Sequence, residues 1–376
     1  MKILIVIDQF NNSNNGTTIS ARRFAKGLQD AGNEVYVVST GDKRDEYKFN
    51  VKELPLLPGI SHIIKSQGMS FAIPNTEVLE KAISSVDVVH FYMPFWLSKS
   101  GLKICEKLKV PHTTAFHVQP ENITYTIGLG TNTKVNDMIY THYRDSFFNR
   151  FTHIHCPSEF IANELKNHGY TAKLHVISNG VDEDFKYYPK EKLPEFKDKI
   201  VIAMIGRYSN EKRQDVLIDA IFKSKYLDKI QLVLAGKGPK EAKYKKLGEK
   251  LPIKPIMKFY DKDNLIKLLK STDLYVHSAD AEIEAISCIE AFACGNVPII
   301  ANSPNSATKQ FALTNESLFE AGNSDDLANK IDFWLDNINY RKEMEIEYAK
   351  SAENYRLKNS IKKMEEMFED AIRECK

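Results

Sequence analysis

The sequence predicts an α/β protein of two doubly wound domains, in which helices cover both faces of a parallel sheet. Three observations lead to this prediction. The chain has 376 residues, more than the length at which a single hydrophobic core keeps growing. Short runs rich in valine and isoleucine alternate with amphipathic stretches, as they do where helices connect parallel strands. A polar, proline-containing segment then separates this series from a second one of the same kind.

The first half opens with a strand, a helix and a strand. Gly32 lies where a glycine commonly ends a helix. The amino-terminal apolar run is too short for a signal peptide, and no stretch reaches the roughly 20 apolar residues that a membrane-spanning helix needs. The elements expected here are strands at 3–7, 35–39, 86–92 and 113–116 and a helix at 20–31.

The second half repeats this architecture after a linker. Residues 184–198 are polar and contain Pro189 and Pro194, without a helical or strand period. A long, charged helical pattern fills about 338–376 and is expected to lie on a surface. The other elements expected here are strands at 199–205, 231–235, 273–277 and 297–301 and a helix at 215–221.

Composition narrows the classes of function. The formal net charge of +2 comes without a strong basic cluster, so nucleic acid is not an expected partner. The five cysteines are scattered and form no Cys-x-x-Cys pair. This spacing fits a reduced, cytoplasmic protein better than a disulfide framework or a zinc site.

The most specific site signal is the segment 278–295, which joins a predicted strand to a predicted helix. Glu282 is expected in the loop after the strand, where open α/β sheets bind ligands, and Glu290 about one turn into the helix. Free amides at the helix start favour a diphosphate, and carboxylates accept hydrogen bonds from sugar hydroxyls. The segment therefore predicts a nucleotide-sugar site, although two glutamates alone also fit a charged loop and helix face.

A basic cluster follows the strand at 199–205. Arg207 and Lys212 leave the carboxyl end of this strand after Gly206. In a site without metal, arginine, lysine and helix amides must meet the negative charge that grows on a leaving diphosphate. These two cations are the candidates, while a basic loop by itself is more often solvated surface.

Three further segments carry weaker signals. Gly16 and Thr17 open the first helix, where close backbone approach suits a phosphate and a hydroxyl suits a cap. His117 follows the strand at 113–116 in a loop crowded with polar groups, so that a structural and a binding role are equally supported. Residues 176–182 end the first half with an Asn-Gly turn.

Taken together and in this order, these segments resemble glycosyltransferase family 4, the retaining enzymes of the GT-B fold, over nearly the whole chain. The matching motifs are Gly206-Arg207-x4-Lys212, Glu282-x7-Glu290, Asn179-Gly180-Val181-Asp182, and the strand and glycine turn at 231–239.

The resemblance implies two Rossmann-like domains that face each other across a cleft. Residues 1–183 would bind the acceptor and be completed by the terminal helix 355–376, and residues 199–354 would bind the nucleotide sugar. No metal and no cofactor are implied, and the nucleotide diphospho-sugar is a co-substrate. Front-face substitution would retain the anomeric configuration.

The resemblance also assigns roles to residues. Arg207 and Lys212 would hold the diphosphate, Glu290 the ribose and Glu282 the donor sugar, while His117 would contact the donor sugar or the acceptor. The residues expected to take part in catalysis are Arg207, Lys212, Glu282 and His117, and those expected to bind the donor are Gly16, Thr17, Gly206, Glu284, Ala285, Ile286 and Glu290.

Two places in the chain depart from the family pattern. After the first glutamate the family commonly has Gly-Phe-Gly, and this chain has Ile283-Glu284-Ala285. Arg213 stands where the family usually has glycine. Glu284 adds an acid beside the donor pocket and Arg213 adds a cation, so the identity of the sugar stays open.

The acceptor is expected to be a glycan or lipid-linked component of the cell envelope. Residues 61–75 and 92–96 carry apolar groups that could meet a lipid, and the lysine-rich stretch 237–258 favours peripheral contact with the inner face of the plasma membrane as well as a solvated helix. The alternatives are a nucleotide-sugar epimerase of the same fold and a non-catalytic sugar-nucleotide-binding partner subunit of another transferase. No Gly-x-Gly-x-x-Gly follows a strand, which argues against a dinucleotide oxidoreductase.

Overall fold

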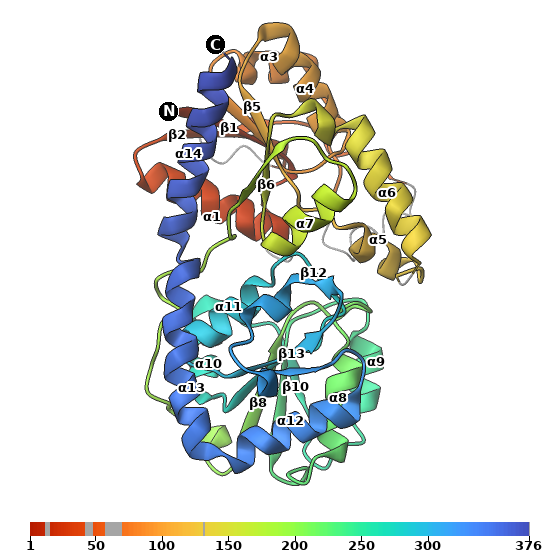
Figure 1. The fold of residues 1–376 in the computed structure, drawn as a ribbon, viewed down its shortest axis with the longest axis vertical. Helices are drawn as coiled ribbons and strands as arrows, with labels where there is room; N and C mark the ends of the chain where they lie inside the picture. Colours follow the sequence, from red (N-terminus) through yellow and green to blue (C-terminus); the bar gives the residue numbers. More distant parts are fainter. Residues whose placement is uncertain (12–15, 42–47, 57–69, 131, 376) are drawn as a thin grey trace. The chain divides into compact units, whose positions relative to one another are not determined.

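The computed structural model describes the chain except residues 12–15, 42–47, 57–69, 131 and 376. The chain divides into two compact α/β units (Figure 1). Unit 1 consists of Met1–Thr124, Thr131–Gly180 and Leu357–Lys376, and unit 2 consists of Tyr125–Gly130 and Val181–Arg356. The prediction of two doubly wound domains is confirmed, because each unit contains a parallel sheet covered by helices.

Unit 1 is built on a seven-stranded parallel sheet of order β3-β2-β1-β4-β5-β6-β7. The order reverses between β1 and β4, so their carboxyl ends flank the crevice in which open α/β sheets bind ligands. The strands are β1 (Lys2–Gln9), β2 (Glu34–Thr40), β3 (Lys48–Asn50), β4 (Val88–Phe91), β5 (His112–Ala115), β6 (His153–Cys156) and β7 (Lys173–Val176). The helices are α1 (Gly16–Asp30), α3 (Thr76–Ile83), α4 (Trp96–Leu108), α5 (Pro120–Thr126), α6 (Thr133–Ser146), α7 (Glu159–Asn167) and α14 (Leu357–Cys375).

Helices α1 and α14 pack together in the core of unit 1. Phe24 of α1 and Met364 and Phe368 of α14 share one apolar cluster with inward side chains of β1. A Cβ atom on Gly27 would lie 2.5 Å from Ile361 Cδ1, so the glycine lets the two helices approach closely. The amino-terminal and carboxyl-terminal segments thereby bury their apolar faces against each other.

Unit 2 has a six-stranded parallel sheet of order β10-β9-β8-β11-β13-β15, which reverses between β8 and β11. Its strands are β8 (Ile200–Ile205), β9 (Ile230–Ala235), β10 (Ile256–Lys258), β11 (Leu274–His277), β13 (Pro298–Asn302) and β15 (Leu318–Glu320), with a separate pair formed by β12 (Ala281–Glu282) and β14 (Asn305–Ser306). Its helices are α8 (Gln214–Lys223), α9 (Glu241–Gly248), α10 (Lys262–Ser271), α11 (Ile286–Ala293), α12 (Ser324–Asp336) and α13 (Ile338–Ser351).

The structure differs from the predicted linker at 184–198, because these residues belong to unit 2. Phe185 and Phe196 are buried in its core, and Lys192 forms an ion pair with Asp273. The segment lacks a regular period because two separated aromatic anchors, rather than a repeating apolar face, attach it to the domain.

The charged pattern at 338–376 also differs from one continuous helix. Helix α13 ends at Ser351, and α14 begins at Leu357. Between them Arg356 has an extended backbone, pairs with Val181 as an isolated bridge, and donates to the carbonyl oxygen of Phe185 at 2.7 Å. The carbonyl oxygen of Tyr355 accepts from the Val181 amide at 2.8 Å instead of from a following helical amide, so the helix breaks there and the chain passes from unit 2 to unit 1.

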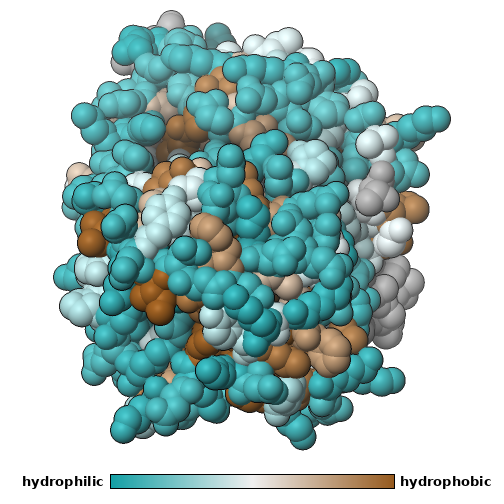
Figure 2. All heavy atoms as spheres, turned by 60° about the horizontal axis from the view of Figure 1, so that its bottom comes forward, coloured by the Kyte–Doolittle hydropathy of each residue, from teal (hydrophilic) through white to brown (hydrophobic). Residues whose placement is uncertain are grey.

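Among the described residues, no helix combines the length and the apolar character needed to cross a membrane. On the face shown in Figure 2, hydrophilic side chains predominate and apolar ones lie in small groups among them. Of the residues 92–96, which the sequence suggested as an exposed apolar group, Tyr92 and Met93 are buried and Trp96 is 54% exposed. Residues 61–69 of the other suggested segment lie outside the described residues.

Candidate functional site

The candidate site in unit 2 lies at the carboxyl ends of β8 and β11, where the sheet order reverses. Gly206 directly follows β8 and donates its amide to the carbonyl oxygen of Ala235. A Cβ atom on Gly236 would lie 2.0 Å from Gly206 O, and one on Gly238 would lie 2.5 Å from Tyr208 O. These glycines are therefore required by the close approach of the two loops that follow β8 and β9.

Lys212 and Glu282 form a largely buried ion pair in this site, with side chains 18% and 11% exposed. His277, the last residue of β11, also contacts Glu282, with 3.0 Å between His277 Nε2 and Glu282 Oε1. Burial alone would raise the pKa of Glu282, but the charge of Lys212 and the hydrogen bond from His277 together lower it to about 2. Glu282 is thus an ionised carboxylate that holds Lys212 in a fixed position.

Arg207 is held beside this pair by its own loop. Its guanidinium donates to Glu211 Oε1 at 2.9 Å, and the side-chain amide of Gln214 donates to its carbonyl oxygen at 2.8 Å. Glu211 is buried and also accepts from Ser209. Two cations, each oriented by a buried carboxylate, therefore leave the end of β8.

At each of the two departures from the family pattern, one residue has a left-handed backbone. Arg213 has φ 53° and precedes α8, and Ala285 has φ 71° and precedes α11. Glycine adopts this conformation without a steric penalty, whereas other L-residues are strained by about 1–2 kcal/mol. The Arg213 side chain pairs with Asp280 at 2.8 Å, an interaction that a glycine could not make.

Helix α11 presents its amino-terminal end to the same site. Ala285 precedes Ile286, the first helical residue, and has no side chain that could cap the first amides. Such amides attract anions. Glu284 and Glu290 are both buried on either side of this helix start, which places carboxylates beside an anion-binding helix end.

In unit 1 the corresponding edge contains a small, partly open pocket, whose lining includes Asp8, Gln9 and Thr17. Gly16 begins α1, and a Cβ atom on it would meet nothing within 4 Å. Asp8 is buried and accepts from the amide of Ala72 at 2.9 Å. Burial raises the pKa of Asp8 to about 7.

His117 lies in a buried group of histidines in unit 1. Its ring stacks on Tyr92 at a centroid distance of 5.2 Å and meets the edge of His155 at 5.6 Å. Burial lowers its pKa well below the usual value, so the ring is neutral. Neither ring nitrogen has a hydrogen-bond partner among the described residues, which leaves both of them for a ligand.

The Asn-Gly turn that ends the first half has a structural role within unit 1. The Ser20 hydroxyl donates to Asn179 Oδ1 at 2.5 Å. Gly180 has φ 76°, and a Cβ atom on it would lie 2.8 Å from Leu357 Cα, the start of α14. The turn thus needs glycine both for its backbone and for the approach of the last helix.

Sequence reasoning found most of the polar groups at these two sheet edges but missed His277 and Asp8. His277 ends the strand expected at 273–277, and Asp8 directly follows the strand expected at 3–7. Only their positions near the carboxyl ends of β11 and β1 could have indicated a role. The structure brings together within unit 2 the predicted residues Gly206, Arg207, Lys212, Glu282, Glu284, Ala285, Ile286 and Glu290, and it places Gly16, Thr17 and His117 in unit 1. Their roles stay predictions.

Two protein families match the chain, one in each half. Residues 14–185 match the family described as glycosyltransferase family 4, and residues 189–352 match the family described as glycosyl transferases group 1. The α-monoglucosyldiacylglycerol synthase of Streptococcus pneumoniae is 24% identical over 321 residues, which cover 80% of this chain and 71% of that protein.

Solved structures are similar as well. Anabaena HepE, in complex with UDP and glucose, has a TM-score of 0.73 and 16% identity over 98% of this chain and 100% of that chain, which shows a shared fold. The catalytic domain of cholesterol-α-glucosyltransferase from Helicobacter pylori is 54% identical over 42% of this chain and 99% of that chain, with a TM-score of 0.39.

Proposed function

The chain belongs to glycosyltransferase family 4, has the GT-B fold and is a hexosyltransferase, and from this premise we propose its donor, acceptor and mechanism. The donor is UDP-glucose. The acceptor is a hydroxyl group of a membrane lipid. Transfer retains the configuration of the anomeric carbon and proceeds without a metal ion.

The observation that carries this proposal is the fixed pair of cations in unit 2. Lys212 is held by Glu282, and Arg207 is held by Glu211, at the carboxyl end of β8. The uncapped amides of α11 lie in the same unit beside Glu282. Preorganised positive charge of this kind stabilises a diphosphate leaving group without reorganisation during the reaction.

In the proposed reaction the bond between the anomeric carbon and the diphosphate oxygen breaks. The acceptor oxygen attacks from the same face, and its proton passes to an oxygen of the leaving phosphate. Arg207 and Lys212 stabilise the negative charge on that phosphate. Glu290 accepts hydrogen bonds from the ribose, and the second oxygen of Glu282 accepts one from a sugar hydroxyl.

His117 and Gly16 contribute from unit 1. The neutral, unpartnered ring of His117 can donate to one hydroxyl and accept from another, which suits a sugar. Gly16 leaves open space at the start of α1, where a phosphate can approach the backbone amides together with Thr17. Glu284 adds a buried carboxylate that selects among sugar hydroxyls.

The relatives support the donor and acceptor classes. The Streptococcus pneumoniae relative is named for an α-glucosylated diacylglycerol, and the Anabaena structure contains UDP and glucose. Lipid acceptors are reached at a membrane surface, and the lysine-rich segment around α9 would attract the enzyme to anionic lipids. Peripheral association at the cytoplasmic face follows from this proposal.

Donor binding is tested first. Thermal shift measurements with UDP, GDP, ADP and their glucose conjugates should show stabilisation by the uridine compounds alone. Transfer is then measured with the stabilising donor and mixed micelles that contain diacylglycerol, cholesterol or no acceptor. The coupling constant of the anomeric proton in the product shows whether the configuration is retained. EDTA at about 5 mM should leave the rate unchanged at a temperature where the protein stays folded.

Variants test the roles proposed for the two cations. Arg207→Ala and Lys212→Ala should each lower kcat about 100-fold, as the loss of one preorganised donor typically does. Lys223→Ala is the matched control, because Lys223 ends α8 and pairs with Asp325 rather than with a site residue. Glu290→Gln should mainly weaken UDP binding. Release of free sugar or an epimerised product without acceptor transfer would favour the epimerase, and nucleotide binding without turnover would favour a non-catalytic subunit.

A further inference from the structure

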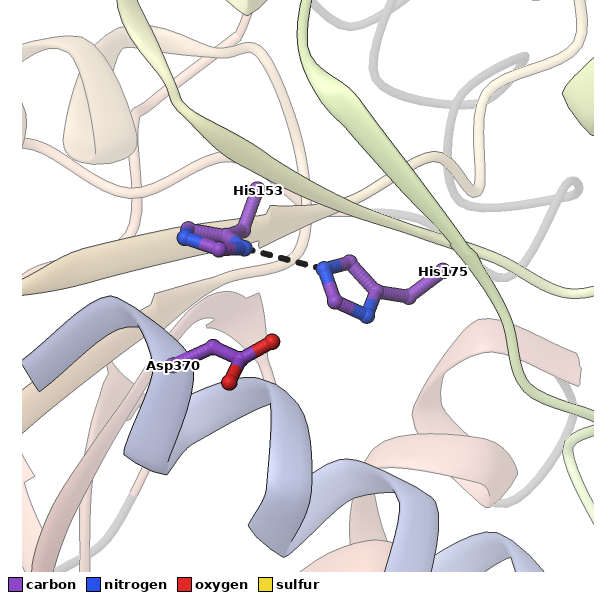
Figure 3. Close-up of side chains that lie close together, drawn as sticks. All are labelled: His153, His175 and Asp370. Atoms are coloured by element: carbon purple, nitrogen blue, oxygen red, sulfur yellow. Dashed lines mark hydrogen bonds between the residues drawn. The ribbon is translucent and has the colours of Figure 1, made fainter. Parts of the chain in front are cut away.

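A group of side chains with the chemistry of metal ligands lies in unit 1, where the last helix meets the edge strand β7 and its neighbour β6. His153 is on β6, His175 is on the neighbouring edge strand β7, and Asp370 is on α14 (Figure 3). One ligand atom of each residue lies within 4.8 Å of the others. Among the described residues, this is the one cluster of three such side chains with this geometry.

We propose that His153, His175 and Asp370 bind a zinc ion that fastens the carboxyl-terminal helix α14 to the sheet edge of unit 1. The sheet and the helix each supply their ligands from regular structure. In the register of β6 and β7, His153 lies opposite Lys173, so His175 is its diagonal neighbour on the strand beside it. Asp370 and Glu374 are four residues apart on α14 and therefore share one face of the helix.

The ligand chemistry favours zinc over magnesium or calcium. Two imidazoles and one carboxylate are a common zinc donor set, with a water or a second carboxylate completing the tetrahedron, whereas magnesium and calcium prefer oxygen ligands. The His153 side chain is fully buried, while the Asp370 side chain is 22% exposed, so the ion has a path from solvent.

Glu374 provides an outer-shell contact that orients His153. Its Oε2 atom accepts from His153 Nε2 at 2.9 Å. This bond places the proton on Nε2 and leaves the lone pair of Nδ1 directed at His175 Nε2, 2.9 Å away. A carboxylate that fixes a histidine tautomer in this way is the usual partner of a metal-binding imidazole.

Binding requires small rearrangements at the edge of the cluster. Ligand atoms of a tetrahedral zinc site lie about 3.4 Å apart when the bonds are about 2.1 Å long, so the widest separation must close by at most about 1.4 Å. Asp370 now pairs with Lys173 at 2.5 Å and with Arg373. Both cations are more than half exposed and can turn toward solvent when the ion neutralises the carboxylate.

The ion would join segments that are far apart in the sequence. The polypeptide runs from residue 175 to residue 370 by way of unit 2. A link between positions so distant in the sequence strongly restricts the conformations of the unfolded chain. The proposed role of the zinc ion is structural, and its ligands are not among the residues assigned to glycosyl transfer. The proposal of a zinc site therefore does not depend on the proposed donor or acceptor.

The test uses the full-length protein without a histidine tag, stripped with EDTA and dialysed. Zinc titration by calorimetry should show one site, and saturating zinc should raise Tm by about 5 °C or more. Asp370→Asn and His175→Gln should each weaken zinc binding at least about tenfold, and Glu374→Gln should weaken it by about 10–100-fold. Glu369→Gln changes an exposed acid on the same helix and is the matched control, which should bind zinc as the wild type does.

Circular dichroism of each stripped variant separates loss of the site from loss of the fold. Folded variants that bind zinc with wild-type affinity, or a wild type that binds no zinc, would overturn the proposal. The same holds if zinc binds without raising Tm. In EDTA the Tm should fall while transfer well below Tm continues, so a failed zinc site and a failed metal-independent transferase give different results.

Discussion

Replacement of Lys212 by methionine tests whether the buried ion pair of unit 2 is held together as the structure indicates. The change keeps the aliphatic chain and removes the charge from beside Glu282, whose side chain is 11% exposed. The carboxylate would then be buried with His277 as its remaining partner. A buried charge that loses its counter-ion is strongly destabilising.

The magnitude follows from the pKa of Glu282, which is lowered from 4.5 to about 2 against the opposing effect of burial. A difference of about 2.5 units corresponds to about 3 kcal/mol of stability at neutral pH. Lys212 makes the largest lowering contribution, so Lys212→Met should reduce the free energy of unfolding by about 2 kcal/mol. Because the folded pKa is depressed, this contribution is present above pH 4.5 and is lost as the pH falls toward 2.

The assay is urea unfolding followed by tryptophan fluorescence. The chain has two tryptophans, the exposed Trp96 of unit 1 and the buried Trp334 of unit 2. In a Trp96→Phe background, Trp334 alone reports the transition of unit 2. A double-mutant cycle with Glu282→Gln should then give a coupling of about 2 kcal/mol at pH 7 that shrinks at pH 3.5. Additive effects within about 0.5 kcal/mol, or a coupling that does not change with pH, would refute the reasoning.

Three further predictions concern backbone and buried charge. Ala285→Gly should leave stability unchanged or raise it by up to about 1 kcal/mol, because it removes the steric strain of an alanine with a left-handed backbone. The matched control Ala291→Gly, in the interior of α11, should lower stability by about 1 kcal/mol. Equal losses at both positions would contradict the presence of strain at Ala285. Asp8→Asn should stabilise unit 1 by roughly 2–4 kcal/mol at pH 8 and have little effect at pH 4. The pKa of Asp8 is raised in the folded state, so burial of the charged form becomes increasingly unfavourable as the pH rises from 3.8 through about 7. Urea unfolding across this pH range measures the stability difference between variant and wild type, and a difference that does not change with pH would exclude a titrating Asp8. Gly236→Ala should destabilise unit 2 by about 2 kcal/mol or more through the contact with Gly206 O. Gly16→Ala should change the Tm of the ligand-free protein little and should weaken donor binding. The opposite order of stabilities would contradict the close approach at Gly236 and the open space at Gly16.

The sequence alone was sufficient to place most strands and the polar clusters at their ends. Alternating apolar and amphipathic segments are local signals, and β1, β8, β9 and β11 lie within two residues of their expected bounds. The motif around Arg207 and Lys212 could be recognised for the same reason, because it follows a strand directly. The departures at Arg213 and Ala285 were visible as well, but only the structure showed that both positions have left-handed backbones.

The tertiary structure decided which distant residues meet. Nothing local marks Phe185 and Phe196 as core residues or Arg356 as the point where a helix breaks, since each depends on a partner elsewhere in the fold. Likewise, His277 becomes a partner of Glu282 through the turn after β11, and Asp370 meets His175 across nearly two hundred residues. Periodicity fixes which face a side chain occupies, whereas sheet order and register fix what lies against that face.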